Sequence, residues 1–367
     1  MKPNIILLYG GDSVEHEISI ITALQLKQNY VGKYNLILCY LKNGKFYFSD
    51  KLNQLKNYKH LNIKPVRFIE NQKYIKVNHK KLYFEAIWLV SHGKNCEDGT
   101  ITSFFKVLNI PIIALNTLSA AIGQNKYLTK LVSNVDSLPS IIITKDDFKY
   151  NKNYLLTKAN ELTYPIILKP NSLGSSVGVS VIYNNIDLIT NIEKLLILDD
   201  TLIMEKCLEH FIELNVAVVK NKDELIVSEI EKVSNSKVLT YKDKYVNKDK
   251  SLNSQNKEIP ANIDESLRES LIRTAKTIYK NMNLSLVVRM DFLYDTDTNT
   301  LYFNELNNIP GSLAFYLFNQ MGISTTTLID MCIDEGLKDI EQNNSIISTY
   351  DKNILSEEIF DNVKFCK

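Results

Sequence analysis

The sequence predicts an α/β domain with a doubly wound parallel sheet, followed by α+β regions, and three patterns support this fold class. Residues 4–9 form an apolar run typical of a strand buried on both faces, and Gly10-Gly11 and a helical segment follow directly. This order opens a doubly wound sheet, which places its ligands at the carboxyl ends of the strands. Residues 165–179 read as strand, small-residue loop and strand. Residues 286–294 and 300–307 are expected to be adjacent antiparallel strands.

The composition limits the classes of protein to consider. A chain of 367 residues suits two or three domains, and a hydrophobic content of 45% can fill their cores. The net charge of +1 gives no basic surface for nucleic acid, and the five cysteines contain no C-x-x-C pair for zinc. The N-terminal apolar run is too short for a signal peptide or a membrane span. We expect a cytoplasmic protein.

Polar residues gather after two strands of the predicted N-terminal sheet. Glu15 lies just past the first strand, and His92 follows the strand expected at residues 84–90. Each has two interpretations: Glu15 contacts a ligand or begins a solvated helix, and His92 contacts a ligand or is a structural histidine. Glu97-Asp98 likewise either faces the ligand or caps the helix expected at residues 100–108. The remaining strands of this sheet are expected at residues 34–41 and 110–114.

The middle of the chain contains a candidate phosphate-binding loop. A helix expected at residues 118–132 carries Lys126 and Lys130, and lysine pairs on helices usually face solvent. Strands are expected at 141–144 and 164–168, around a helix at 150–162. Lys169 then ends a strand, and a loop rich in glycine and serine follows, with Gly174, Ser175 and Ser176 at its centre. Backbone N–H groups at glycines and serine hydroxyls suit a phosphate, although a plain hairpin uses the same residues to turn.

The last third of the chain carries a candidate metal site. Along residues 286–294, Arg289 and Asp291 fall on one face, and the period of two puts Glu305 and Asn307 on one face of the next strand. Two carboxylates and an amide suit Mg²⁺, and we favour a metal site over a buried salt bridge between Asp291 and Arg289. Gly311 then presents a backbone N–H as an oxyanion donor.

Taken together, these motifs resemble the D-alanine–D-alanine ligases of the ATP-grasp superfamily, over residues 4 to about 335. Seven motifs occur in the family's order: Gly10-Gly-Asp-Ser-Val-Glu-His-Glu-Ile-Ser19, His92-Gly with Glu97-Asp-Gly-Thr100, Lys126-x-x-Thr-Lys130, Lys169-Pro with Gly174-Ser-Ser-Val-Gly178, Tyr241-x-x-Lys-Tyr245, Arg289-x-Asp-Phe292 and Asn304-Glu-x-Asn-x-x-Pro-Gly311. The resemblance implies an ATP-grasp fold, in which two α+β subdomains clamp ATP beside the N-terminal α/β domain.

The resemblance also implies a reaction and site residues. ATP would phosphorylate one D-alanine, and the amine of a second would attack the acyl phosphate to give the dipeptide, ADP and phosphate for peptidoglycan synthesis. The implied ATP-binding residues are Lys126, Lys169, Gly174, Ser176, Glu205 at the adenine, Glu213 at the ribose and Lys244 at the γ-phosphate. Asp291, Glu305 and Asn307 would hold two Mg²⁺ ions, with Mn²⁺ as an alternative. The implied catalytic residues are Glu15, Ser175, Tyr245, Arg289 and Gly311, and the implied substrate-binding residues are His92, Ser312 and Tyr316.

Several positions depart from the family pattern. Cys96 replaces a glycine, Asn125 an aspartate, and Ile212 and Asn215 an arginine and a carboxylate. Tyr316 stands where the family has a serine that holds the second substrate's carboxylate. The alternatives are therefore a related ligase with another amino acid or amine as acceptor, and a nucleotide-binding regulator without activity; an aromatic Tyr245 favours an amine acceptor.

The resemblance also suggests the organisation of the chain. We expect an N-terminal domain at residues 1–120, a central subdomain at 121–208, a catalytic subdomain at 209–340 and an extension of unknown role at 341–367. Family members usually pair through the N-terminal region, so a homodimer is expected.

Overall fold

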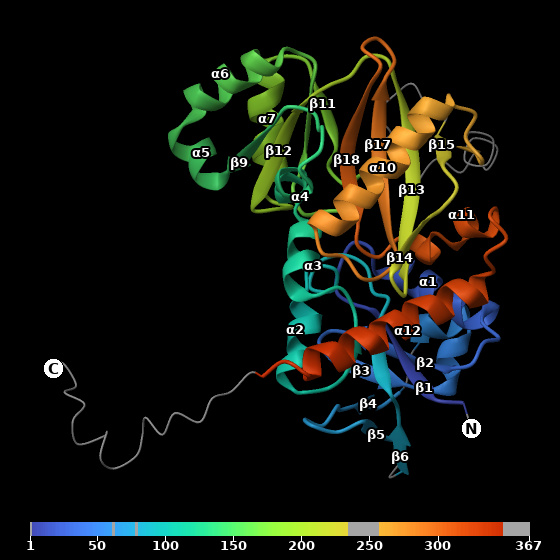
Figure 1. Cartoon of the computed structure of the whole chain (residues 1–367). Helices are drawn as coiled ribbons and strands as arrows, with labels where there is room; N and C mark the ends of the chain where they lie inside the picture. Colours follow the sequence, from blue (N-terminus) through green and yellow to red (C-terminus); the bar gives the residue numbers. More distant parts are fainter. Residues whose placement is uncertain (1, 61–62, 78–79, 234–256, 348–367) are drawn as a thin grey trace, which may run out of the picture.

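The computed structural model describes residues 2–60, 63–77, 80–233 and 257–347. Within these ranges the chain forms three main sheets in succession, which we call the N-terminal, central and C-terminal sheets, and one small hairpin of β5 (Tyr74–Val77) and β6 (Lys80–Tyr83) (Figure 1). In this part of the chain, no helix is long and apolar enough to cross a membrane.

The N-terminal sheet has the strand order β4-β3-β2-β1-β7-β8. Its bounds are β1 (Asn4–Gly10), β2 (Asn35–Lys42), β3 (Lys45–Phe48), β4 (Pro65–Val66), β7 (Ala86–Leu89) and β8 (Ile112–Ile113). The predicted parallel arrangement is confirmed for β2, β1, β7 and β8, whereas β3 and β4 extend one edge antiparallel. Asn43 and Gly44 join β2 to β3 with positive φ angles of 49° and 64°, the geometry of a tight hairpin turn.

The first two of four helices pack on the N-terminal sheet, and the other two lead from it to the central sheet. They are α1 (His16–Asn29), α2 (Thr100–Val107), α3 (Thr117–Gln124) and α4 (Lys126–Ser133), with the short helices η1 (Asp50–Asn53) and η2 (Leu55–His60) near the edge. The single helix predicted at residues 118–132 is wrong: it is α3 and α4, separated at Asn125. The backbone of Asn125 is extended, and its side-chain oxygen accepts a hydrogen bond from the N–H of Leu128, so this residue caps α4.

The central sheet has the order β11-β10-β12-β9 and its own apolar core. Its elements are β9 (Ser140–Thr144), α5 (Lys145–Tyr150), α6 (Lys152–Leu162), β10 (Ile166–Pro170), β11 (Ser180–Ile182), α7 (Asn185–Leu195) and β12 (Thr201–Lys206). The predicted strand–loop–strand at residues 165–179 is confirmed, because β10 and β11 pair antiparallel around the loop. We call residues 172–178 the flap. The helix predicted at 150–162 is confirmed as α6, and the separate helix α5 precedes it, with Asn151 between the two.

The C-terminal sheet runs β16-β15-β13-β17-β18, and β14 also pairs with β13. Its strands are β13 (Phe211–Asn221), β14 (Glu224–Val227), β15 (Glu231–Val233), β16 (Lys257–Glu258), β17 (Val288–Asp295) and β18 (Thr300–Asn307), and helix α10 (Glu265–Asn281) packs on β13 and β14. The predicted antiparallel pairing of β17 with β18 is confirmed, with a bulge that leaves Asn304 without an opposite residue. After η3 (Gly311–Ala314) and α11 (Phe315–Asn319), helix α12 (Thr325–Asn344) returns to the N-terminal domain and packs on β8 (Figure 1).

Candidate active site

One face of the C-terminal sheet carries a row of polar residues. The strand registers place Glu231 opposite Asn215, Asn215 opposite Asp291, and Asp291 opposite Glu305. Cross-strand neighbours share a face, so four strands contribute to one row. The next row along this face contains Arg289 opposite Asn307. The structure therefore brings together Asp291, Glu305 and Asn307, as the sequence predicts.

Asp291 forms a salt bridge with Arg289 on its own strand. The guanidinium donates from Nε to Oδ1 at 2.7 Å and from Nη2 to Oδ2 at 2.8 Å, and Asn307 donates to Oδ2 at 3.1 Å. The salt bridge that the sequence offered as the alternative to a metal site is therefore present. Within the described ranges no three Asp, Glu, His or Cys side chains gather as a metal site. The predicted set of two carboxylates and one amide still suits Mg²⁺, which accepts water and phosphate oxygens as its other ligands.

A second charged cluster lies between α4, β10 and β12. Glu205 is 2% exposed and lies between two lysines: it pairs with Lys130 through Oε1 and with Lys169 through Oε2 at 2.6 Å. Lys169 also donates to the side-chain oxygen of Asn304 at 3.3 Å, which links the central sheet to the C-terminal one. Burial opposes ionisation of Glu205, but the two lysines lower its pKa to about 2. Lys130, expected to face solvent, is instead buried.

Lys126 connects the flap to the metal-ligand candidates. Its Nζ donates to the carbonyl of Leu173 at 2.6 Å and lies 3.5 Å from Glu305 Oε2. The first residue of α4 therefore contacts both the flap and the C-terminal sheet.

The flap meets the N-terminal domain at Glu15. Ser175 Oγ donates to Glu15 Oε1 at 2.6 Å, and a Cβ added to Gly174 would lie 2.8 Å from the same oxygen. Only glycine can approach the carboxylate this closely without displacing it. Burial is the main reason that the pKa of Glu15 is raised. Glu15 is thus a buried contact of the flap rather than a solvated helix start.

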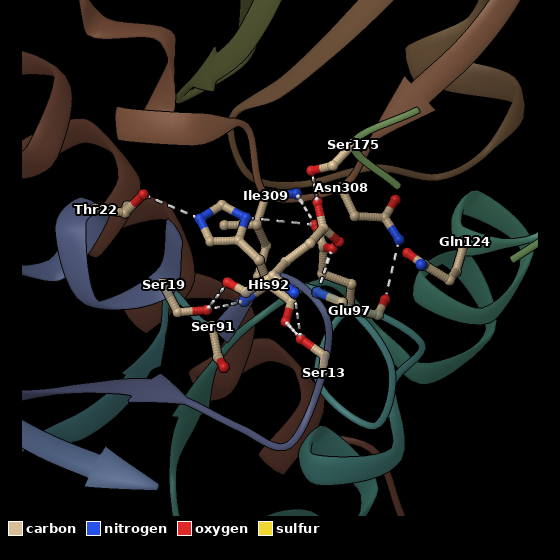
Figure 2. A network of polar contacts seen from close by, with 12 residues as sticks. Ser13, Ser19, Thr22, Ser91, His92, Glu97, Gln124, Ser175, Asn308 and Ile309 are labelled. Carbon is tan, nitrogen blue, oxygen red and sulfur yellow. Dashed lines mark hydrogen bonds and ion pairs between the residues drawn. The ribbon is translucent and has the colours of Figure 1, made fainter. Parts of the chain in front are cut away.

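His92 is a buried histidine with protein partners that also lines a cavity. Its Nε2 lies 3.0 Å from Thr22 Oγ1, and its Nδ1 lies 4.0 Å from Glu97 Oε1 (Figure 2). Burial lowers the pKa of His92 to about 4, so the ring is neutral at physiological pH. The interpretation as a structural histidine is confirmed, and contact with a ligand in the cavity stays a prediction.

Glu97 is a site residue that the sequence did not distinguish from a helix cap. Its carboxylate accepts hydrogen bonds from the backbone N–H of Gly93 at 2.6 Å and of Ile309 at 3.1 Å (Figure 2). Burial and the nearby Glu15 raise the pKa of Glu97 to about 8. The capping role belongs to Asp98, which accepts from the N–H of Thr100 at 3.0 Å. Glu97 thus ties the N-terminal domain to the loop after β18.

The segment after Gly311 contains the residues predicted to bind the second substrate. Residues 312–314 have positive φ angles of 50–53°, a sparsely populated conformation for residues other than glycine. Ser312 donates from its hydroxyl to Gln25 on α1, and its N–H donates to Thr22 Oγ1 at 3.3 Å. Both Ser312 and His92 therefore contact Thr22, so the structure brings these two predicted residues together.

Tyr316 lies at the other end of the polar row. Its hydroxyl donates to Glu231 Oε2 at 3.2 Å, and Asn215 donates to the same oxygen at 3.1 Å. Lys257 pairs with Glu231 Oε1 at 2.8 Å and lies over the Tyr316 ring. The family pattern has a carboxylate at position 215, where this chain has Asn215. Glu231 supplies a buried carboxylate directly opposite that position.

Two cavities meet inside the cleft. The first, which we call the β10–β12 cavity, is lined by Lys169, Glu205, Glu213, Asp291 and other residues. The second, which we call the Glu15 cavity, is lined by Glu15, His92, Glu97, Ser175, Arg289, Asn307, Gly311 and other residues. Lys126, Ser176 and Glu305 line both. Lys244 and Tyr245 lie outside the described residues, and Ser312 and Tyr316 are not among the lining residues of either cavity.

A cavity lined by lysines under a glycine–serine flap, joined to a second polar cavity within three successive sheets, is the arrangement of an ATP-dependent ligase of the ATP-grasp class. Residues 4–114 match the family described as D-ala D-ala ligase N-terminus, and residues 133–334 match D-ala D-ala ligase C-terminus. The chain belongs to the D-alanine–D-alanine ligase family, whose members are ATP-dependent ligases.

Relatives match along nearly the whole chain. A D-alanine–D-alanine ligase of Thermosipho africanus is 34% identical, covering 97% of this chain and 99% of its own. The solved D-alanine–D-alanine ligase of Coxiella burnetii has a TM-score of 0.78 at 21% identity, covering 99% of each chain. The VanG D-Ala:D-Ser ligase of Enterococcus faecalis has a TM-score of 0.76 at 24% identity, covering 92% of this chain and 100% of its own. The two structures support the fold.

Proposed function

We propose that this enzyme joins two D-alanines through a D-alanyl phosphate and releases D-alanyl-D-alanine, ADP and phosphate. One structural observation supports this proposal independently of the family membership. The β10–β12 cavity and the Glu15 cavity share the lining residues Lys126, Ser176 and Glu305. A nucleotide in the first cavity would present its terminal phosphate at this junction. An amino acid carboxylate in the second would then lie next to it.

The first cavity supplies the nucleotide contacts. Lys126 and Lys169 face the α- and β-phosphates, with N–H groups of the flap at Gly174 and Ser176 above them. Glu205 contacts the adenine and Glu213 the ribose. Lys244, outside the described residues, reaches the γ-phosphate.

The second cavity supplies the chemistry. Glu15 and Ser175 fix the first D-alanine under the flap, together with Tyr245 outside the described residues. A carboxylate oxygen attacks the γ-phosphorus, the bond to the β-phosphate oxygen breaks, and ADP leaves. Asp291 in the first cavity, Asn307 in the second and Glu305 in both would hold two Mg²⁺ ions, which would neutralise charge on the phosphates.

The second D-alanine then attacks the acyl phosphate. Its amine forms the C–N bond, the tetrahedral intermediate expels phosphate, and the nitrogen loses one proton. We assign Arg289 Nη1, which Asp291 does not use, and the N–H of Gly311 to the oxyanion of this intermediate. His92, which lines the Glu15 cavity, would lie near the substrates, and we assign Ser312 and Tyr316 to the second substrate from the family pattern, since they line neither cavity. The proposal also includes a cytoplasmic homodimer and the division at residues 1–120, 121–208 and 209–340.

The test is ADP release with D-alanine, then with D-serine, other D-amino acids and D-lactate, with the products identified by mass. D-alanyl-D-alanine as the main product supports the proposal. Release only with another amine assigns a different acceptor, consistent with Tyr316 in the place of the family serine. Absence of release with the whole panel, despite ATP binding, would overturn ligase activity.

A further inference from the structure

Lys130 is buried behind the β10–β12 cavity and does not line it. Its exposed fraction is 5%, against 2% for Glu205 and 6% for Lys169, and only the latter two are lining residues. Lys130 contacts Glu205 on the side away from Lys169, because each lysine takes a different carboxylate oxygen. It is therefore a buried cation that touches the site through one intermediary.

The charges of this cluster do not cancel. Two lysines share one carboxylate, which leaves a net charge of +1 among side chains that are almost fully excluded from water. Burying a lysine is costly, and burial lowers the pKa of Lys130. A single Lys169–Glu205 pair would already balance the charge of the carboxylate, although Glu205 Oε1 would then lack its cationic partner. The extra buried cation is therefore not needed to neutralise Glu205.

We propose that Lys130 is a positioning residue that keeps Glu205 from neutralising Lys169. By holding Oε1 of Glu205, it divides the negative charge of that carboxylate between two cations, and Lys169 retains positive charge toward the cavity. This inference rests on the proposed function, since it takes the cavity to bind the phosphates of a nucleotide. Without Lys130, Lys169 and Glu205 form a neutral pair. The cluster then has no net positive charge to attract the phosphates.

A second substitution at Glu205 should recover the MgATP affinity that is lost when Lys130 is replaced. Lys130→Met removes one charge and leaves the neutral pair, so affinity for MgATP should fall on the order of tenfold. Lys130→Met combined with Glu205→Gln restores the net charge of these three side chains to +1, because Lys169 is then the charged one among them, while the nearby Glu305 is unchanged. Affinity should recover most of the loss, although Glu205 itself is a proposed adenine contact. Lys130→Arg, which keeps the charge, should stay within about threefold of the unaltered enzyme.

The measurement is calorimetric binding of MgATP to the full-length enzyme without amino acid, with thermal unfolding to confirm that each variant is folded. Lys158→Met on α6 is the control, because Lys158 forms an exposed pair with Glu161 at 2.6 Å and should have no effect. Recovery in the double variant supports the charge mechanism, since a merely structural Lys130 predicts that the second substitution adds to the damage. Unchanged affinity in Lys130→Met, or further loss in the double variant, would overturn it. Failure of the unaltered enzyme to bind MgATP would instead contradict the proposed function.

Discussion

Glu15 and Ser175 are 160 positions apart in the chain and are joined by a 2.6 Å hydrogen bond. The contact closes the flap on the N-terminal domain, and its carboxylate acceptor is buried. Hydrogen bonds to charged groups contribute roughly 1.5–3 kcal/mol.

Ser175→Ala should therefore lower kcat/KM for D-alanine on the order of 10- to 100-fold, because the closed flap loses its contact with Glu15. Steady-state ADP release measures this effect. Ser180→Ala on β11 is the matched control and should leave the rate unchanged. Equal rates for Ser175→Ala and the control would show that the contact is not used in turnover.

Asp291→Asn should reduce activity on the order of 100-fold or more, because Arg289 loses its bidentate partner and the proposed metal site loses a charge. Saturating Mg²⁺ should restore little of the rate. Asp297→Asn, which breaks only an exposed pair with His210, serves as the control. Similar activity in the two variants would contradict the role given to Asp291.

Glu97 should make stability depend on pH. Its folded pKa of about 8 lies above the ordinary carboxyl value of about 4.3, so its contribution is fully present below about pH 4.3 and is lost as pH rises through about 8. Glu97→Gln removes the titration, so the unfolding free energy of the variant relative to the unaltered enzyme should increase between pH 5 and pH 9. Urea denaturation at several pH values measures the difference. A difference that does not change with pH would show that the pKa is not raised.

Tyr316→Phe should cost about 1 kcal/mol of stability, because buried Glu231 loses one of its hydrogen-bond donors. The Michaelis constant for the second D-alanine should rise while that for ATP stays unchanged. Tyr294→Phe removes a hydroxyl bonded to exposed Asn299 and should change neither quantity. An equal rise in both Michaelis constants would argue against an acceptor role.

Gly336→Ala should destabilise the enzyme by roughly 1–3 kcal/mol, since the new Cβ would lie 2.3 Å from Ile113 Cγ2. The cost should shrink in an Ile113→Ala background, where that methyl group is absent. Urea denaturation of the four proteins of this cycle gives the coupling. A cost that is independent of Ile113 would place the strain elsewhere.

Local patterns predicted the residues whose neighbours are set by strand geometry. A period of two fixes the face of the sheet on which Asp291 and Glu305 each lie. The antiparallel pairing of β17 with β18 then places the two residues opposite each other. Lys169 and the flap followed from the same kind of short-range pattern.

The residues that were missed depend on packing between distant segments. Lys130 is buried with its ammonium group against Glu205, which lies on β12 much later in the chain, and no property of α4 alone shows this. The one indication in the sequence is the spacing: Lys130 follows Lys126 by four positions, so both lie on the same face of the helix and Lys130 could point toward the same site. Glu97 was indistinguishable from a cap because Asp98 beside it has the same chemistry and does bond to the start of α2.

The return of α12 to the first sheet has a mechanical consequence. Tyr30 and Tyr34 donate to Asp330 and Asp334 on this helix, so the last described helix is fastened to the first part of the chain. The two parts that carry Glu15 and Arg289 are thereby held as one body, and the distance between them is set by the framework. A movement that admits a nucleotide would then fall to the central sheet, whose flap meets this framework at Glu15.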